Sequence, residues 1–284
     1  MRQRTNYKEV IKPPIGSTIN WRHPMAKDLI GVWLFNEGAG APVELMRRTR
    51  GTFTNYNSWR TGPRGKSLAW NDSMHLSYPD TYLKQPQVLS WACGLRRGGT
   101  VDSYARPFGK TFADGGSAPY VTYDFEVNPA GAGQNHALAS IGTTTALHTT
   151  TAFDTGDLTI PRIFLGTYVA GTLKFYMNGI LRSTNASVTG TVSYDTGADA
   201  AFLISSASAA GVNQWNGDIY WIYIWQRCLN ETEAMSLNLS PYQFINWRRK
   251  SYFFGEPPPA GGININQIER KIFRGVLRGV GRGQ

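Results

Sequence analysis

Residues 172–182 read Thr-Leu-Lys-Phe-Tyr-Met-Asn-Gly-Ile-Leu-Arg, and this stretch indicates a β-hairpin. Apolar and polar side chains alternate before Asn178 and Gly179, as they do in a strand with one buried face. Asn followed by Gly readily adopts the two positive φ angles of a type I′ turn. The sequence therefore predicts two antiparallel strands joined at Asn178 and Gly179.

Short apolar runs of a similar kind occur along most of the chain, separated by clusters of Gly, Asp and Ser. Runs of this length that are rich in β-branched and aromatic residues are typical of strands. They predict strands over residues 29–35, 66–70, 75–78, 88–95, 120–127, 137–141, 162–169, 201–205 and 218–225. Asn230, followed three residues later by Glu233, predicts the capped start of a short helix through Leu237. Everything after Pro241 is interpreted as a tail.

The composition agrees with one large, β-rich domain. In 284 residues, 41% hydrophobic residues, 31 Gly and 15 Pro suit many short strands joined by turns, and they argue against a helical bundle or a disordered chain. Cys93 and Cys228 lie in apolar runs, where we interpret them as buried thiols, with a disulfide between them left open. No apolar run approaches the roughly 18 residues of a spanning helix, so we expect no membrane partner.

The formal net charge of +10 is concentrated at the two ends of the chain. Residues 1–27 carry a net charge of +5 and residues 246–284 a net charge of +6, whereas residues 28–245 are nearly neutral. We therefore predict an extended basic N-terminal arm over 1–27, a folded domain over 28–245 and a basic C-terminal arm over 246–284. Because the positive charge is not spread over the folded domain, we do not expect a nucleic-acid partner.

The C-terminal arm contains a second pattern, a one-sided apolar helix within residues 264–277. A helix this short is marginal alone in water, so we expect it to dock on a neighbouring protein as an assembly arm. A frayed soluble tail is the alternative. The apolar stripe consists of Ile265, Ile268, Ile272 and Val276, and the basic residues around it include Arg270, Arg274 and Arg278.

The strand predicted over 218–225 carries an aromatic face. Strand alternation places Trp221, Tyr223 and Trp225 on one side of the strand. It places Tyr220, Ile222 and Ile224 on the other side. Exposed aromatic patches usually mark contact surfaces, and sugar rings stack on such side chains. These three residues are therefore candidates for a glycan or protein binding surface, and the alternative is that the arms or a loop cover them.

Five stretches resemble the laminin-G-like, concanavalin-A-type jelly rolls, in a version frequent among phage and prophage structural proteins. They are Pro-Pro-Ile-Gly at 13–16 with residues 23–38, Gly-Pro-Arg-Gly-Lys-Ser-Leu at 62–68, Leu-Lys-Phe-Tyr-Met-Asn-Gly at 173–179, Trp-Asn-Gly-Asp-Ile at 215–219 with Gln-Arg-Cys-Leu at 226–229, and Ser-Pro-Tyr-Gln-Phe at 240–244 before Arg-Arg-Lys at 248–250. The resemblance implies an all-β fold, an antiparallel β-sandwich with extended terminal arms.

The chain departs from this family in the loop at 44–51, Glu-Leu-Met-Arg-Arg-Thr-Arg-Gly. Many relatives have a loop rich in Gly, Asn and Asp after the first strand, whereas this loop has three arginines and one acid. Calcium requires six to eight oxygen ligands, several of them from carboxylates. We therefore expect no metal and no cofactor.

Catalytic patterns are few. Glycosidases on related jelly rolls place two carboxylates on one strand face, and Asp124 and Glu126 have the required spacing. An isolated acidic pair on a strand is more often solvated surface, which is how we interpret this one. The four histidines, His23, His75, His136 and His148, share no ligand spacing. We therefore expect no enzymatic activity.

The resemblance and the arms together imply a structural protein of a phage virion, such as a capsid decoration protein, a head fibre or a tail adhesin subunit. Its expected partners are other virion proteins and further copies of itself, and its expected location is the virion. The alternative is a lectin-like module that binds carbohydrate, which explains the aromatic residues but gives the arms no role.

Overall fold

The hairpin at residues 172–182 is present as predicted. β14 (Thr172–Met177) pairs antiparallel with β15 (Ile180–Asn185), and the φ angles of Asn178 and Gly179 are 51° and 78°. Leu173, Phe175 and Met177 point into the main core, so the alternation in β14 also gives the buried face correctly. The turn residues therefore set the register of these two strands.

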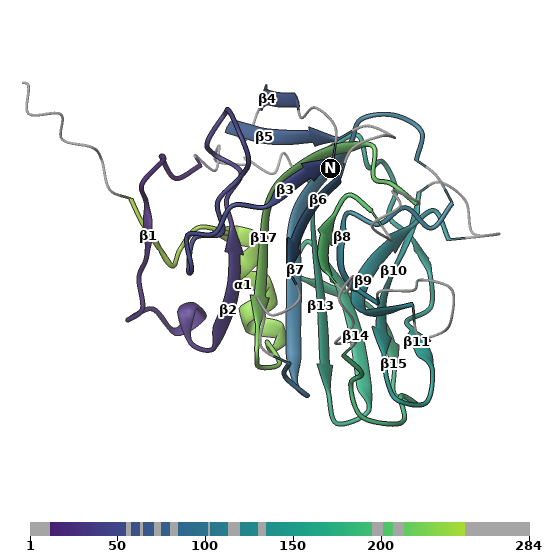
Figure 1. The fold of residues 1–284 in the computed structure, drawn as a ribbon. Helices are drawn as coiled ribbons and strands as arrows, with labels where there is room; N and C mark the ends of the chain where they lie inside the picture. Colours follow the sequence, from purple (N-terminus) through teal and green to yellow (C-terminus); the bar gives the residue numbers. More distant parts are fainter. Residues whose placement is uncertain are drawn as a thin grey trace, which may run out of the picture. The chain divides into compact units, whose positions relative to one another are not determined.

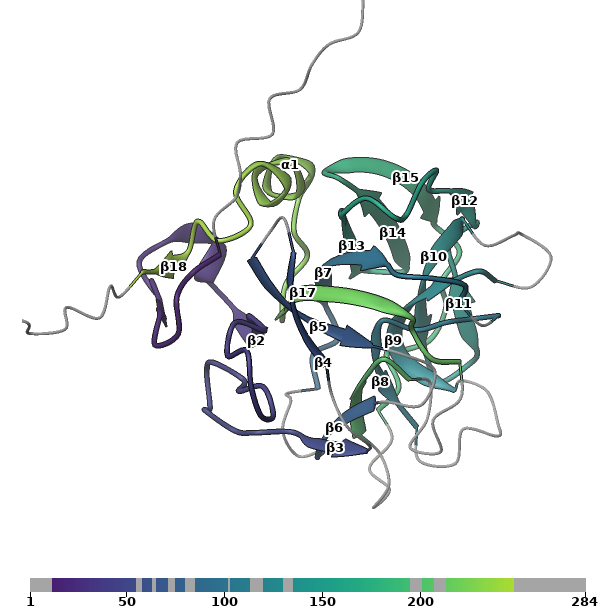
Figure 2. The same cartoon turned by 90° about the horizontal axis from the view of Figure 1, so that it is seen from above.

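The structure is a computed structural model that describes residues 12–54, 58–62, 65–70, 75–79, 85–101, 103–112, 120–129, 135–194, 201–206 and 213–247. These residues belong to one compact unit that ends at Arg248. Two antiparallel sheets of eight strands each form a sandwich within this unit (Figures 1 and 2).

The first sheet has the order β15-β14-β13-β7-β17-β5-β4, with β2 beside β17. Its remaining strands are β2 (Leu29–Trp33), β4 (Ser58–Gly62), β5 (Gly65–Trp70), β7 (Leu89–Arg97), β13 (Arg162–Val169) and β17 (Gly217–Trp225). The second sheet has the order β11-β10-β9-β8-β16-β6-β3, with β12 beside β10. Its strands are β3 (Thr52–Thr54), β6 (His75–Pro79), β8 (Phe108–Thr111), β9 (Val121–Val127), β10 (His136–Gly142), β11 (Leu147–Thr149), β12 (Phe153–Asp154) and β16 (Ala201–Ile204).

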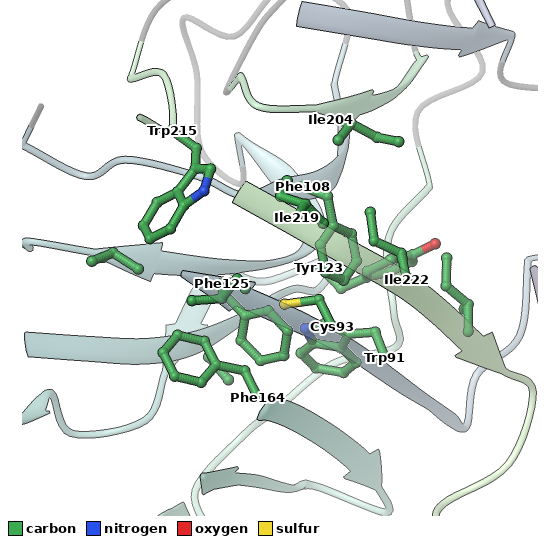
Figure 3. Packing of buried hydrophobic residues seen from close by; sticks show 14 of the residues in the cluster. Trp91, Cys93, Phe108, Tyr123, Phe125, Phe164, Ile204, Trp215, Ile219 and Ile222 are labelled. Carbon is green, nitrogen blue, oxygen red and sulfur yellow. The ribbon is translucent and has the colours of Figure 1, made fainter. Parts of the chain in front are cut away.

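The main hydrophobic core lies between the two sheets. Figure 3 shows Phe125 of the second sheet beside Trp91 and Phe164 of the first, and its ring centroid lies 6.0 Å and 5.6 Å from theirs. Cys93 is buried in the same core. Aromatic pairs at such distances add to the free energy gained by burying their area, so the facing strands are held together by interdigitated rings.

Each predicted strand range overlaps an observed strand, which confirms the all-β antiparallel sandwich. The short helix is also confirmed as α1 (Glu231–Leu239). The Asn230 side chain accepts a hydrogen bond of 2.9 Å from the Glu233 backbone N–H, and the Glu233 carboxylate accepts one of 3.0 Å from the Asn230 N–H. This capping box fixes the start of α1.

The two ends of the described chain pair with each other. β1 (Thr18–Ile19) pairs antiparallel with β18 (Ile245–Asn246), and Figure 2 shows β18 beside the purple N-terminal segment. We call residues 12–27 and 242–247 the terminal strap; it includes a short 3-10 helix, η1 (Pro24–Ala26). The buried hydrophobic residues of the strap are Ile19, Met25, Ala26, Tyr242, Phe244 and Ile245.

The terminal strap corrects two expectations. Residues 12–27 pack onto the sandwich and are not an extended arm, and residues 242–247 are not a tail, because they include β18 and buried side chains. Lys12 contributes to this packing, since its buried ammonium donates hydrogen bonds to the backbone carbonyls of Phe35, at 2.7 Å, and Lys66.

The outer edge of β2 is occupied by the loop that departs from the family pattern. The buried Glu44 carboxylate accepts hydrogen bonds from the backbone N–H groups of Val32 (2.9 Å), Met46 (3.0 Å) and Arg47 (2.7 Å). The Arg47 side chain donates to the Ile30 carbonyl at 3.0 Å. This acid and this arginine therefore bond to the backbone of β2.

Candidate functional site

The aromatic face of β17 is buried. Trp221, Tyr223 and Trp225 are at most 1% exposed, and they form a second core with the terminal strap and α1. The rings of Trp221 and Tyr223 stack with centroids 4.4 Å apart, and Phe244 of the strap lies 4.9 Å from Tyr223. The assignment of this face as an accessible binding surface is therefore wrong, and the alternative, coverage by the terminal segments, is what the structure has.

The assembly arm is not part of the described chain. Its candidate residues, Ile265, Ile268, Ile272, Val276, Arg270, Arg274 and Arg278, all lie outside the described residues. The docking helix therefore stays a prediction.

The acidic pair lies on β9, on the face of the second sheet that points away from the main core. Tyr123, Phe125 and Val127 of the same strand enter the core, so Asp124 and Glu126 alternate with them. The sequence-based interpretation of this pair as solvated surface is wrong, because Asp124 is 0% and Glu126 4% exposed.

One arginine is shared by the two acids. Arg106 Nε lies 2.5 Å from Asp124 Oδ2, and Arg106 Nη2 lies 3.2 Å from Glu126 Oε1. The Ser140 hydroxyl donates a further hydrogen bond of 3.4 Å to Glu126. Burial, with the nearby charge of Asp124, raises the pKa of Glu126 to about 7, although Arg106 and Ser140 oppose the rise. Burial also raises the pKa of Asp124 against the effect of Arg106.

The chemistry of this trio is that of an internal ion pair with one acid in excess. A glycosidase requires its two carboxylates to reach the sugar from either side. Here both are directed at the same guanidinium, and the two side chains are at most 6% exposed. Arg106 was not among the candidates predicted from the sequence, because it lies 18 and 20 residues before its partners in the chain.

A hollow of about 230 Å³ lies on the outer face of the first sheet, beside the start of α1. Thr167 and Val169 of β13 and Thr172, Lys174 and Tyr176 of β14 form one wall, and Cys228, Leu229, Asn230 and Glu231 form the other. We call this the β14–α1 hollow. The alternation of β14 explains its wall, since the residues between Leu173, Phe175 and Met177 must face outward.

The walls of the β14–α1 hollow expose more apolar than polar surface, and they carry both signs of charge. The Lys174 ammonium and the Glu231 carboxylate lie 3.8 Å apart. Burial, and then the Glu231 and Cys228 groups, raise the pKa of Tyr176 to about 12. Burial also raises the pKa of the half-buried Cys228 thiol. Cys228 and Cys93 are both free thiols, on opposite faces of the first sheet.

Within the described ranges, no three or more His, Cys, Asp or Glu side chains are grouped so that they could hold a metal ion. The described helices include none with the length and apolar character needed to span a bilayer.

Residues 95–235 match the family model described as the concanavalin A-like lectin/glucanases superfamily. No curated protein sequence matches the chain.

Three solved structures illustrate the similarity of fold. Domain 4 of AbnA, an extracellular arabinanase from Geobacillus stearothermophilus solved in complex with arabinotriose, aligns with a TM-score of 0.58 and 16% identity over 74% of this chain and 98% of that domain. Trypanosoma rangeli sialidase, in complex with the inhibitor DANA, gives 0.53 and 12% over 83% of this chain and 36% of the sialidase. The botulinum neurotoxin type G receptor binding domain gives 0.50 and 13% over 75% of this chain and 51% of that domain.

The arabinanase domain is spanned almost completely, whereas about a third of the sialidase and half of the neurotoxin domain are spanned. At these identities the alignments establish the fold. Together with the match over residues 95–235, the two facing antiparallel sheets show that this chain has a laminin-G-like sandwich fold, similar to that of the concanavalin A-like lectin/glucanases superfamily.

Proposed function

We propose that this chain is a non-enzymatic structural subunit of a phage virion, a capsid decoration, head fibre or tail adhesin protein that displays the sandwich and is anchored by its basic termini. The observation that carries the proposal is the pairing of β1 with β18. This pairing brings residues 18–19 and 245–246 together on a nearly neutral domain, while the positive charge of the sequence lies mostly toward the two ends of the chain.

The non-enzymatic part of the proposal is supported by the trio of Arg106, Asp124 and Glu126. A buried carboxylate that is bound to an arginine is poorly placed to act as a nucleophile or an acid on a sugar. Incubation with β-glucans and arabinans should give no new reducing ends. Turnover that disappears in Glu126→Gln would overturn this part.

The anchoring part is tested by deleting residues 257–284, a change that leaves the terminal strap intact. We expect a folded, monomeric protein that no longer enters phage particles, as measured by mass spectrometry of purified virions. A sharper variant replaces Ile268 and Ile272 with Asn, and Gln267→Ala serves as its control outside the apolar stripe. Equal incorporation of the truncated and full-length chains would remove the anchor from the proposal.

A second candidate is a carbohydrate-binding module, which is compatible with display on a virion. It is supported by a similar fold in an arabinanase domain that was solved with arabinotriose and in a neurotoxin receptor binding domain. A glycan array probed with the purified protein tests this candidate, and a protein that retains its fold but binds no glycan on the array would argue against it.

A further inference from the structure

An exposed apolar surface lies between α1 and the edge strand β15 of the first sheet. Met235 and Leu239 are four residues apart in α1, so they share one side of that helix. The start of β15 lies beside them, because a methyl group added to Gly179 in the preceding turn would be 2.8 Å from the Met235 Cα. We call the side chains of Ile180, Leu181, Met235 and Leu239 the α1–β15 patch; they are 49%, 38%, 40% and 71% exposed.

The α1–β15 patch has the character of a contact surface. β15 has β14 on one side, and no described strand pairs with its other side. Large apolar side chains that gather on the surface of a folded domain usually mark an interaction site. The β14–α1 hollow, whose lining is mostly apolar, borders the start of the same helix. Apolar surface is therefore available at both ends of α1.

The same chain carries an apolar stripe of matching length, in the helix predicted over residues 264–277, outside the described residues. The stripe consists of Ile265, Ile268, Ile272 and Val276. At 1.5 Å per residue, a helical stripe from the first to the last of them would be about 16 Å long, and α1 is about 13 Å long. The stripe is therefore long enough to lie along the whole of α1, in the way that amphipathic helices bind apolar surfaces.

The charges of these two surfaces are complementary at the end of α1. Glu233 is paired with Arg227 at 2.7 Å, and Glu231 lies 3.8 Å from Lys174, so both acids at the start of the helix have a basic neighbour. No basic residue lies in the last turn of α1, where the carbonyl groups carry partial negative charge. Residues 264–278 carry four basic residues and one acid. A basic helix therefore suits this end of α1.

We propose that residues 264–277 of one copy of this chain dock on the α1–β15 patch of a second copy. The inference rests on the assembly function proposed above and identifies the neighbour that the C-terminal segment holds. Residues 248–264 separate Trp247 from the stripe, and a chain of that length spans up to about 60 Å. This reach is sufficient for a neighbouring domain, since a domain of this size has a radius of gyration of about 18 Å. Because segment and patch are different surfaces, the contact repeats head to tail and joins copies into a ring or a row.

The contact is tested by sedimentation velocity of full-length chains at increasing concentration. The patch variant carries Met235→Lys and Leu239→Lys, and the tail variant carries Ile268→Asn and Ile272→Asn. Each should weaken self-association by at least about 10-fold, as the loss of an apolar anchor does at an interface. If denaturant unfolding shows that the patch variant is destabilised, Leu239→Lys alone replaces it, since this side chain is 71% exposed.

Two control variants should associate as the wild type does. Tyr120→Lys is the control for the patch, because Tyr120 is 38% exposed and immediately precedes β9 of the second sheet. Gln267→Ala is the control for the tail, outside the apolar stripe. A wild type that stays monomeric at every concentration overturns the inference. Association that persists in the tail variant also overturns it, since the patch would then pair with something other than residues 264–277.

A mixture of the two variants tests whether the contact joins different copies. The patch variant keeps an intact C-terminal segment, and the tail variant keeps an intact patch. An equimolar mixture should therefore form 1:1 dimers, although neither variant associates alone. These dimers should not grow, because the segment and the patch that remain unused are both defective. A mixture that stays monomeric, as docking within one chain would produce, overturns the inference.

Mass spectrometry of purified virions separates this inference from the proposed function. We expect reduced incorporation of both the patch variant and the tail variant. If only the tail variant is lost from the particles, the C-terminal segment docks on another virion protein, so this inference fails and the anchoring proposal stands. Equal incorporation of all variants, together with no self-association, overturns both.

Discussion

The indole N–H of Trp225 donates a hydrogen bond of 2.7 Å to the backbone carbonyl of Met25, a residue 200 positions earlier in the chain. This bond joins the last long strand of the first sheet to the N-terminal part of the terminal strap. Both groups are buried, so neither has water as a substitute partner. The bond is therefore a sensitive point for the attachment of the strap.

Trp225→Phe should keep the fold but destabilise it by about 1–3 kcal/mol, because the Met25 carbonyl is left buried without this donor. Denaturant unfolding measures the loss, and amide hydrogen exchange over residues 19–26 should become faster. Trp21→Phe is the control, since Trp21 is 60% exposed and should change the unfolding free energy little. Unchanged exchange in Trp225→Phe would mean that the strap is held by its other contacts.

Removal of residues 1–27 should destabilise the sandwich, because it takes away β1 and the buried side chains of Ile19 and Met25. Tyr223 and Trp225 would then face solvent. The expected signs are a lower denaturant midpoint and stronger binding of a hydrophobic dye. A truncated protein that unfolds at the same denaturant concentration as the full chain would contradict the place of the strap in the second core.

Gly179→Ala should be considerably more damaging than Gly16→Ala, although both glycines have a positive φ, of 78° and 86°. The added methyl group at Gly179 would lie 2.8 Å from the Cα of Met235 in α1, whereas at Gly16 no heavy atom lies within 4 Å. We expect about 1 kcal/mol for Gly16→Ala and about 3 kcal/mol or more for Gly179→Ala. Gly179→Val should be worse still. Equal costs, measured by thermal or denaturant unfolding, would show that backbone strain outweighs the contact with α1.

The free energy of unfolding should fall as the pH rises from the pKa of Glu126 in the unfolded chain to its higher pKa in the folded protein. Its pKa is raised from 4.5 to about 7 by burial, so between these values the folded protein keeps a proton that the unfolded chain has lost. Unfolding then releases a proton and becomes easier at higher pH. The full effect corresponds to about 3 kcal/mol.

The measurement compares urea unfolding at about pH 5 and about pH 7.5, a range chosen from that rise in pKa. The wild type should be more stable at the lower pH, as far as this residue is concerned, and Glu126→Gln should show a flatter dependence. The raised pKa of Asp124 acts in the same direction and remains in the variant. Identical slopes in the two proteins would contradict the assignment to Glu126.

The sequence predicted the parts of the fold that local patterns control. Asn178 and Gly179 form the expected turn, and Asn230 with Glu233 form the expected cap, because in both cases the interacting groups lie within a few residues. The two-residue strands β1 and β18 were missed, since their pairing joins positions more than 220 residues apart and neither is long enough to show an alternation.

The site residues were less predictable, for a related reason. Alternation correctly grouped Trp221, Tyr223 and Trp225 on one face, but it carries no information on whether another segment covers that face. The same limit applies to Asp124 and Glu126, whose burial depends on packing beyond their own strand. The β14–α1 hollow combines β13 and β14 with residues 228–231, which only the folded chain brings together.

The outer edge of β2 is protected by two side-chain hydrogen bonds to its backbone. The Glu44 carboxylate accepts from the Val32 N–H, and the Arg47 guanidinium donates to the Ile30 carbonyl. An open strand edge presents unpaired backbone N–H and C=O groups with which another chain can pair as an added strand, and this is a common route to aggregation. At β2, the acceptor and donor that an incoming strand would need are already engaged by a carboxylate and a guanidinium. Edge-to-edge pairing between two copies of this domain is therefore blocked at these positions of β2.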